Sequence, residues 1–518
     1  MRAITSTPFL LLAWLGVAHV APVMAEEISA CEALAEQAPE ATVIHSAETV
    51  AAGAFMPPGP QAAGPGAQYS ELPEFCRVTG SIQPSADSDI RFELWLPAAT
   101  WNGKFLQTGN GGAAGAIIYD SLANGLQRGY AVANTDTGHQ GGMGDFTWAV
   151  GHPEKLVDYQ HRAVHELTRV GKAVTESRYG RAPEKSYWLG CSTGGRQGLK
   201  EAQKYPADYD AIIAGAPANN LLALLTLTAH IQHEVVSSGL GTEQLKQLQE
   251  AAIAACDAHD GIVDRLIARP ERCTFDPSSL QCARAEQEDC LTEPQVAAAQ
   301  RLYAGLVDDA GNELFPGTGP GSEREWGAYA MPMFRIGTSY FQNVVYQDPD
   351  WDPASLDPAA AIARAEQLDA GAAKAMDPDL SEFVANGGKL ILFHGTTDGM
   401  IPYRNTVNYY DSVIDHLGDE TAQQHVRLYL VPGMNHCSGG EGPFNIDWLT
   451  ALEQWSEDNV APGAVTGSHP DEIPDYFGMD APQPSQPYSR PVCPYPQVAK
   501  YSGSGSQTDA ANFSCGSP

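Results

Sequence analysis

The pentapeptide Gly-Cys-Ser-Thr-Gly at residues 190–194 constrains the fold more than any other segment, because its two flanks have different structural preferences. An apolar, strand-like run at residues 186–189 leads into it, and a helix-compatible run at residues 196–202 follows it. A strand that reverses sharply into a helix needs small residues around the turn, and Gly190, Gly194 and Gly195 supply them. The pattern predicts a strand–turn–helix unit with Ser192 at its tip; the alternative is an ordinary glycine-rich turn.

Strand-like runs alternate with helical patterns through much of the chain. Alternation of this kind is typical of a mostly parallel sheet with helices on both faces. Combined with the serine turn, it predicts an α/β-hydrolase core. The strand-like runs are residues 92–96, 104–107, 130–134, 186–189, 211–215, 390–393 and 426–430, and a helical pattern covers residues 159–177.

The strand series stops between residues 216 and 379 and resumes at residue 389. This interval contains four cysteines, an acidic loop and several aromatic residues. We therefore expect a lid domain, residues 216–380, inserted between two parts of the core, residues 26–215 and 381–518. The second part ends in a tail rich in Pro, Ser and Gly, where a disulfide would restrain the end of the chain.

Residues 1–25 have the features of an export signal. Arg2 supplies a positive charge, residues 9–20 are apolar, and Ala25 ends a short cleavage-site pattern. The apolar run is too short for a comfortable membrane span, and an uncleaved anchor is the alternative. Ten cysteines fit an oxidising compartment, so we expect a secreted or periplasmic protein.

The formal net charge of the chain is −33. A surface this acidic repels phosphate backbones and anionic lipids, which argues against nucleic acid and membrane partners. The charge favours solubility and carries no information about a catalytic site. The expected partner is a small-molecule substrate.

A serine hydroxyl needs a base to accept its proton, and in an α/β-hydrolase the acid and then the base follow the serine along the chain. Asp398 lies in the loop after the run at residues 390–393, and His436 lies in the loop after the run at residues 426–430. We therefore predict Ser192, Asp398 and His436 as the catalytic residues. The alternatives are His394 and His139 for the base and Asp447 for the acid.

Two cysteines stand next to the predicted catalytic residues: Cys191 precedes Ser192 and Cys437 follows His436. If the serine and the histidine are hydrogen-bonded, the two cysteines come within disulfide range. We expect a bridge between them that ties the serine turn to the base loop; the alternative is that Cys437 pairs elsewhere. No CxxC spacing occurs, which argues against a zinc or redox function.

The nine residues from Gly190 to Gly198, the His-Gly pair before Asp398 and the adjacent His436 and Cys437 together resemble the tannase and feruloyl esterase family. The resemblance covers nearly the whole chain after the export signal. It implies hydrolysis of carboxylic esters of aromatic acids. It also implies five disulfides, whose connectivity the sequence alone leaves open: Cys31–Cys76, Cys191–Cys437, Cys256–Cys273, Cys282–Cys290 and Cys493–Cys515.

The resemblance further implies an oxyanion hole. One donor is the backbone N–H of Thr193, the residue after the predicted nucleophile. The other comes from the glycine-rich turn at residues 109–112, where we choose Gly112 over Gly111. Each donor of this kind is worth roughly 3 kcal/mol of transition-state stabilisation.

Residues 257–266 place three carboxylates in a short glycine-containing loop between Cys256 and Cys273. Calcium prefers such carboxylate and carbonyl oxygens. The loop resembles the calcium loop in the lid of the family and lacks the length and terminal Glu of an EF-hand. The resemblance implies a structural Ca²⁺; a solvated acidic turn is the alternative. The implied ligands are the carboxylates of Asp257, Asp260 and Asp264 and the carbonyls of Ile262 and Leu266.

Aromatic and thioether side chains late in the lid, at residues 331–335 and 340–341, suit a planar ring, although they could equally form lid core. From these segments we expect Arg335 and Phe341 to contact substrate. Because Thr193 is small and neutral, we favour a hydroxycinnamate (feruloyl) ester. The alternatives are a gallate ester, as for a tannase, and a terephthalate monoester, as for the family's mono(2-hydroxyethyl) terephthalate hydrolase. A catalytically inactive binding module of the same fold is the alternative outside enzymes.

Overall fold

The central sheet of this computed structural model has nine strands in the order β1-β2-β3-β5-β4-β6-β7-β10-β11. The structure describes all residues except 2–29, 59–66, 285–288, 474–482 and 485, so the predicted export signal lies outside the described residues. The strands are β1 (Thr42–Val50), β2 (Phe75–Ile82), β3 (Ile90–Pro97), β4 (Lys104–Thr108), β5 (Ala131–Thr135), β6 (Lys185–Cys191), β7 (Ala211–Gly215), β10 (Lys389–Gly395) and β11 (Val426–Val431).

The six strands from β5 to β11 in this order run parallel, whereas β1, β2 and β3 join them as antiparallel neighbours. All seven runs predicted as strands are strands of this sheet. β1 and β2 are two further strands that no predicted run covers. Polar and exposed positions are frequent in β1, as expected for an edge strand, and no continuous apolar run marks it.

Helices cover both faces of the sheet, as the alternation predicts. Neighbouring residues of one strand point to opposite sides: Val132 belongs to the apolar cluster that includes α2 and α14, while Ala131 and Ala133 belong to the cluster on the other face, which includes α4, α5 and α12. The predicted helix at residues 159–177 is a wide turn at residues 158–162 followed by α4. The core helices are α1 (Ala67–Ser70), α2 (Tyr119–Gln127), α3 (Pro153–Val157), α4 (Ala163–Tyr179), α5 (Thr193–Lys204), α11 (Ser381–Ala385), α12 (Tyr403–Leu417), α13 (Asp419–His425) and α14 (Trp448–Asp458).

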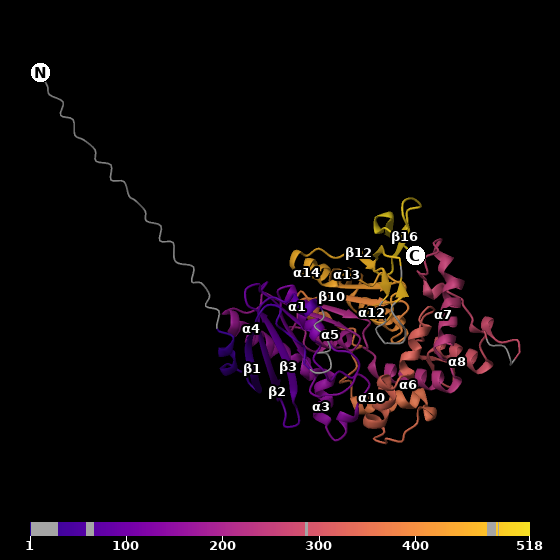
Figure 1. Ribbon diagram of the computed structural model, residues 1–518, viewed down its shortest axis with the longest axis horizontal. Coiled ribbons are helices and arrows are strands. Elements are labelled where there is room, and N and C mark those ends of the chain that lie inside the picture. The colour runs from indigo at the N-terminus through magenta and orange to yellow at the C-terminus, as the bar shows by residue number, and fades with distance from the viewer. Residues whose placement is uncertain (2–29, 59–66, 285–288, 474–482, 485) are drawn as a thin grey trace.

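The lid enters the fold between two adjacent strands. β7 and β10 pair in parallel from Ala211 opposite Lys389 to Gly215 opposite Phe393, although the whole lid separates them in sequence. Figure 1 shows α6, α7 and α8 together at the end of the molecule opposite β1 and β2. The lid elements are α6 (Leu221–Ser238), α7 (Thr242–Cys256), α8 (Glu293–Ala304), β8 (Leu306–Val307), β9 (Glu313–Phe315), the 3₁₀ helix η8 (Glu323–Ala330), α9 (Ile336–Tyr340) and α10 (Pro358–Asp369).

Lid and core share one apolar cluster rather than forming separate bodies. Buried residues of α6 and α8 pack with Phe146 and Tyr159 of the core and with Met400 and Ile401 after β10. The lid is therefore packed onto the edge of the sheet where its parallel strands end. That edge is where ligands bind in open α/β sheets.

Short two-stranded pairs and disulfides organise the C-terminal tail. Three two-stranded pairs follow β11: β12 (Val465–His469) with β15 (Tyr488–Val492), β13 (Glu472–Ile473) with β14 (Gln483–Pro484), and β16 (Val498–Tyr501) with β17 (Phe513–Gly516). All five expected disulfides are formed, including Cys493–Cys515 in the tail. In the described part of the chain, no helix combines the length and apolar character that a membrane span requires.

Candidate active site

Ser192 occupies the sharp turn between β6 and α5, with φ 63° and ψ −123°. The glycines around it are required by close backbone contacts. A Cβ on Gly190 would lie 2.4 Å from the carbonyl oxygen of Gly194, and a Cβ on Gly195 would lie 2.3 Å from that of Gly215. The strand–turn–helix unit predicted from the sequence is therefore present. Its serine has a backbone conformation that residues other than glycine rarely adopt.

Asp398 lies in the turn after β10 and is fully buried. Its Oδ1 accepts backbone N–H groups of Met400 at 2.9 Å and Ile401 at 2.7 Å. Its Oδ2 lies 2.7 Å from Nδ1 of His436, which follows β11. Since a carboxylate only accepts hydrogen bonds, Nδ1 of His436 carries the proton and Nε2 is free to act as a base. The predicted acid and base are thus brought together from adjacent strand ends.

The ionisation of this pair suits base catalysis. Burial opposes the charge on Asp398, but the charge of His436 and the hydrogen bonds from His394 and His436 lower the pKa of Asp398. Burial likewise opposes protonation of His436, but the charge and hydrogen bond of Asp398 and the nearby Glu325 raise its pKa above the usual 6.5. The site therefore stabilises an imidazolium, the species that forms when the base accepts a proton.

The disulfide between Cys191 and Cys437 joins the two loops that carry Ser192 and His436. Its Cα atoms are 6.0 Å apart, and the bridge links residues 246 positions apart in sequence. Each catalytic candidate is therefore one residue from a covalent crosslink. The structure confirms the predicted pairing, and with it the expectation that the serine turn and the base loop are held together.

One cavity, about 420 Å³ in volume, contains both Ser192 and His436 in its wall. Its other walls are mainly apolar and come from both core and lid. Met333 and Phe334 belong to the lid segment singled out from the sequence, whereas Met143 and Met400 do not, because their distance along the chain hides their proximity. The apolar and small side chains in the wall are Met143, Ala218, Leu221, Leu224, Leu225, Met333, Phe334, Ile336, Met400 and Ile401.

The predicted oxyanion donors also lie in this wall. Thr193 begins α5, where backbone N–H groups are free of helix partners, and Gly111 and Gly112 line the cavity beside it. The Thr193 hydroxyl donates to the Gly112 carbonyl at 2.6 Å, which fixes this glycine turn against the nucleophile turn. Gly112 has φ +55°, and a Cβ there would lie 2.3 Å from the Met143 carbonyl.

The alternatives for the base and the acid have other contacts. His139 is buried, stacks on Trp148 and bonds the Ala113 carbonyl at 2.7 Å, and burial lowers its pKa to about 4. Asp447 caps α14 and pairs with Arg128 at the surface. His394 is buried behind Asp398, with Nε2 3.1 Å from the same Oδ2 that His436 contacts. None of the three lines the cavity that contains Ser192.

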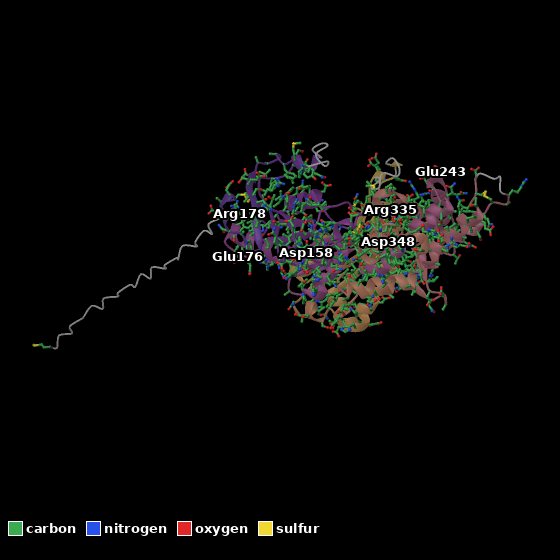
Figure 2. The ribbon with its side chains drawn as sticks, turned by 90° about the horizontal axis from the view of Figure 1, so that it is seen from below. Asp158, Glu176, Arg178, Glu243, Arg335 and Asp348 are labelled. Atoms are coloured by element: carbon green, nitrogen blue, oxygen red, sulfur yellow. A yellow bond between two sulfur atoms is a disulfide. The ribbon has the colours of Figure 1, made fainter. Side chains whose placement is uncertain are left out.

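The structure does not bring Arg335 and Phe341 into the cavity wall. Arg335 is exposed and lines a neighbouring hollow with Asp145 and Gln342, and it lies in the lid half of the molecule in Figure 2. Phe341 is fully buried in the lid core, with its ring 5.3 Å from that of Trp351. The lid stretch with aromatic and thioether side chains reaches this cavity through Met333 and Phe334, but residue type could not indicate which of its side chains face the cavity.

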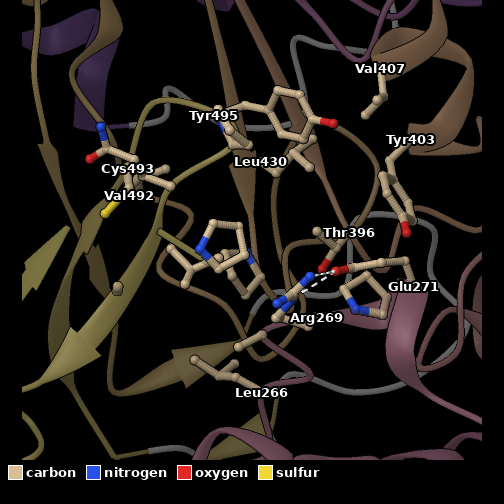
Figure 3. A pocket seen from close by; sticks show the side chains of 18 of the residues that line it. Leu266, Arg269, Glu271, Thr396, Tyr403, Val407, Leu430, Val492, Cys493 and Tyr495 are labelled. Carbon is tan, nitrogen blue, oxygen red and sulfur yellow. Dashed lines mark hydrogen bonds and ion pairs between the residues drawn. The ribbon is translucent and has the colours of Figure 1, made fainter. Parts of the chain in front are cut away.

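A second cavity of about 370 Å³ lies between the lid, β11 and the tail, as Figure 3 shows. Apolar side chains such as Leu266, Leu430 and Val492 form much of its wall. The Arg269 guanidinium faces it but is paired with Glu271 at 2.7 Å. This wall includes neither Ser192 nor His436, so the catalytic candidates define the other cavity as the candidate active site.

The acidic loop in the lid has the donor types that calcium prefers. Burial first, and then the charges of Asp260 and Asp257, raise the pKa of Asp264 to about 6, although Arg490 opposes this. A divalent cation would relieve that repulsion. The Arg490 guanidinium contacts Asp264 at 2.6 Å, and the three carboxylates are not all within 4.8 Å of one another. Binding an ion would therefore draw the carboxylates together around it.

The serine turn after a parallel strand, the buried Asp398–His436 pair at the next strand ends and the strand order together define an α/β-hydrolase. Residues 76–516 match the family described as Tannase and feruloyl esterase. The chain belongs to this family.

Individual relatives agree with this assignment. An uncharacterized esterase of Xanthomonas campestris pv. campestris is 35% identical, with 94% of this chain and 91% of the relative covered. Mono(2-hydroxyethyl) terephthalate hydrolase of Piscinibacter sakaiensis is 31% identical, with 95% and 92% covered. The crystal structure of feruloyl esterase B from Aspergillus oryzae is 30% identical and superposes with a TM-score of 0.83, covering 94% of this chain and 99% of that one. The protein is a carboxylic ester hydrolase.

Proposed function

We propose that this enzyme hydrolyses hydroxycinnamate esters such as ferulates through an acyl-enzyme on Ser192. The observation that supports the substrate class is the apolar cavity around this serine. Its wall offers three methionines and Phe334, which suit the face and edge of an aromatic ring. The relatives include a feruloyl esterase of similar length and fold.

In the proposed reaction, Nε2 of His436 accepts the Ser192 proton while the serine Oγ attacks the ester carbonyl. The carbonyl electrons move onto oxygen, where the N–H groups of Thr193 and Gly112 would stabilise the charge. The intermediate collapses, and the alcohol leaves with the proton from His436. Water then attacks the acyl-enzyme, giving its proton to His436, and the acid is released as Ser192 regains a proton.

The charges in the cavity wall favour one of the three candidate acids, ferulic, gallic and terephthalic acid. Apart from His436, the described residues that line the cavity include no ionisable side chain other than Tyr329. A terephthalate monoester would place a carboxylate in this apolar space without a cationic partner, which is costly. A gallate would place three hydroxyls there, whereas a ferulate needs a partner for one hydroxyl. Thr228 is a polar wall residue of suitable kind.

The substrate proposal is tested by comparing kcat/KM for methyl ferulate, methyl gallate and mono(2-hydroxyethyl) terephthalate. We expect methyl ferulate to be preferred by tenfold or more, about 1.4 kcal/mol in transition-state binding. A tenfold preference for either alternative would overturn the choice of acid. Hydrolysis of a short-chain nitrophenyl ester, measured alongside, reports esterase activity that does not depend on the acid.

We also propose that the acidic loop of the lid binds a structural Ca²⁺ through Asp257, Asp260, Asp264 and the carbonyls of Ile262 and Leu266. The supporting observation is the crowding of partly buried carboxylates in a loop closed by the Cys256–Cys273 disulfide. The ion would brace the lid and take no part in the reaction.

A further inference from the structure

One carboxyl group of the lid reaches the backbone behind the proposed triad. Glu325 lies in η8 and is 2% exposed. Its Oε2 accepts the N–H of Gly399, the residue after Asp398, at 2.8 Å. The N–H of His436 points at the same carboxyl, 3.2 Å from Oε1 and 3.3 Å from Oε2. A single lid side chain therefore bridges the loop of the acid and the loop of the base.

The packing of η8 leaves this contact little freedom. A Cβ on Gly399 would lie 2.4 Å from the Ser322 carbonyl and 2.9 Å from Cβ of Glu325, so the acid loop fits against the lid only with glycine there. One helical turn further on, the Tyr329 hydroxyl donates to the Met400 carbonyl at 3.0 Å. The lid thus forms hydrogen bonds with the loop of Asp398 at two successive residues, Gly399 and Met400.

The position is electrostatically unfavourable for a merely structural hydrogen bond. The titratable groups that face Glu325 are Asp398, His436 and Tyr329. Burial first, and then the charge of Asp398, raise the pKa of Glu325 to about 8, while His436 lowers it. A second buried carboxyl beside an ionised one is costly, and arrangements of this kind concentrate at functional sites. Since a carboxyl with this pKa is mostly protonated at neutral pH, its contribution to the pair lies in the hydrogen bonds it accepts from the two loops.

We propose that Glu325 is a positioning residue, through which the lid sets the orientation of Asp398 and His436. This inference rests on the proposed serine mechanism. Glu325 does not line the substrate cavity, so its effect falls on kcat and leaves KM largely unchanged. The lid then has two separate roles: its apolar residues bind the acyl group, and Glu325 organises the catalytic pair.

The chain offers a matched control two residues away. Glu323 lies in the same helix η8, is fully buried and accepts hydrogen bonds from the Tyr303 hydroxyl and from the Gly321 N–H at 3.0 Å. Burial raises its pKa to about 7. No contact joins its carboxyl to Asp398 or His436 among the described residues. Glu323→Gln therefore reproduces the change in burial, size and charge without touching the proposed triad.

The experiment compares Glu325→Gln, Glu325→Ala, Glu323→Gln and Ser192→Ala with the wild type in kcat and KM for a nitrophenyl ester, in the pH profile of kcat/KM and in melting temperature. We expect kcat to fall about 10- to 100-fold in Glu325→Ala and less in Glu325→Gln, which keeps one acceptor oxygen. The acid limb of kcat/KM should stay close to that of the wild type in Glu325→Gln, because a carboxyl with a pKa of about 8 is already mostly protonated at the pH of that limb. Glu323→Gln should retain both the wild-type kcat and the position of the limb.

Two results would overturn the inference: a wild-type kcat in folded Glu325→Gln and Glu325→Ala, or the same kcat in Glu325→Gln as in Glu323→Gln. If Glu325→Ala does not fold, the Glu325→Gln comparison decides alone. An active Ser192→Ala would instead contradict the serine mechanism. An inactive Ser192→Ala with no effect specific to Glu325 would contradict only the positioning role.

Discussion

His394 Nε2 lies 3.1 Å from Oδ2 of Asp398, the oxygen that also bonds His436. The same nitrogen lies 2.9 Å from the Ile401 carbonyl, so it faces two acceptors and carries the proton, while Nδ1 accepts from the Thr406 hydroxyl at 2.8 Å. The acid is therefore held from behind by a second imidazole that substrate does not reach.

We expect His394→Ala to reduce kcat about tenfold, because Asp398 loses one of the partners that orient and ionise it. The variant should also melt at a lower temperature, since the side chain is fully buried. Thr406→Val is the control: it removes the hydroxyl on Nδ1 and keeps the bond to Asp398, so its kcat should fall less. An unchanged kcat in folded His394→Ala would contradict this role.

Ser192→Ala should reduce hydrolysis of a nitrophenyl ester by several orders of magnitude, because no other nucleophile takes part in the proposed reaction. Alanine is smaller than serine and the turn is built by its glycines, so circular dichroism and melting temperature should stay close to those of the wild type. A folded variant with near-full activity would show that the nucleophile has been misassigned.

Replacing both Cys191 and Cys437 by Ala should lower kcat as well as stability, because the bridge orders the two loops that carry Ser192 and His436. Cys31→Ala with Cys76→Ala is the matched control, since this disulfide joins the first 3₁₀ turn, just before β1, to β2. Loss of either bridge should cost roughly 2–4 kcal/mol of unfolding free energy. Full kcat in the first double variant would mean that the bridge only stabilises the fold.

The profile of kcat/KM against pH should rise as His436 loses its proton, with a midpoint above 6.5, because Asp398 raises the pKa of this base. Activity is present above this midpoint and is lost as the pH falls through it. Asp398→Asn removes the charge that raises the pKa, so its midpoint should move to lower pH while kcat falls by about 10⁴-fold. A wild-type midpoint below 6.5 would argue that another group controls the profile.

Chelation with EDTA should lower the melting temperature before it affects kcat, because the proposed calcium braces the lid and lies outside the reaction. Added Ca²⁺ should restore the melting temperature. Asp260→Asn should remove this response, whereas Asp276→Asn, a change in an exposed lid carboxylate that caps a helical turn, should keep it. Metal analysis without calcium and a melting temperature indifferent to EDTA would exclude the site.

The parts of the fold that could be predicted are those with a local signature. Residues 390–393 and 426–430 are short apolar runs, and Asp398 and His436 follow them at the ends of parallel strands, so their meeting follows from strand order. β1 carries no such run, because one edge and one face of it meet solvent. The Cys191–Cys437 pairing could be inferred because the two cysteines adjoin Ser192 and His436, which were predicted to lie next to each other in the catalytic site.

The contacts of Glu325 had no comparable signal. Its partners, Gly399 and His436, are 74 and 111 residues away, and a Glu in a lid segment has the composition of any solvated helix. Arg335 and Phe341 show the same limit: residue type suggested that they contact substrate, but Met333 and Phe334 of the same stretch line the cavity instead. Long-range packing, rather than composition, decides which lid residues face the site.

The pairing of β7 with β10 has a consequence for how this enzyme could be altered. Both ends of the lid connect to neighbouring strands that are hydrogen-bonded along five residue pairs. The sheet can therefore accept a different lid at this point without a change in strand pairing. A lid grafted from another esterase would bring its own acyl specificity without disturbing the strand order. It would succeed as a catalyst only if it also presented a hydrogen-bond acceptor to Gly399 and His436 in place of Glu325, so grafts should be screened for turnover and binding separately.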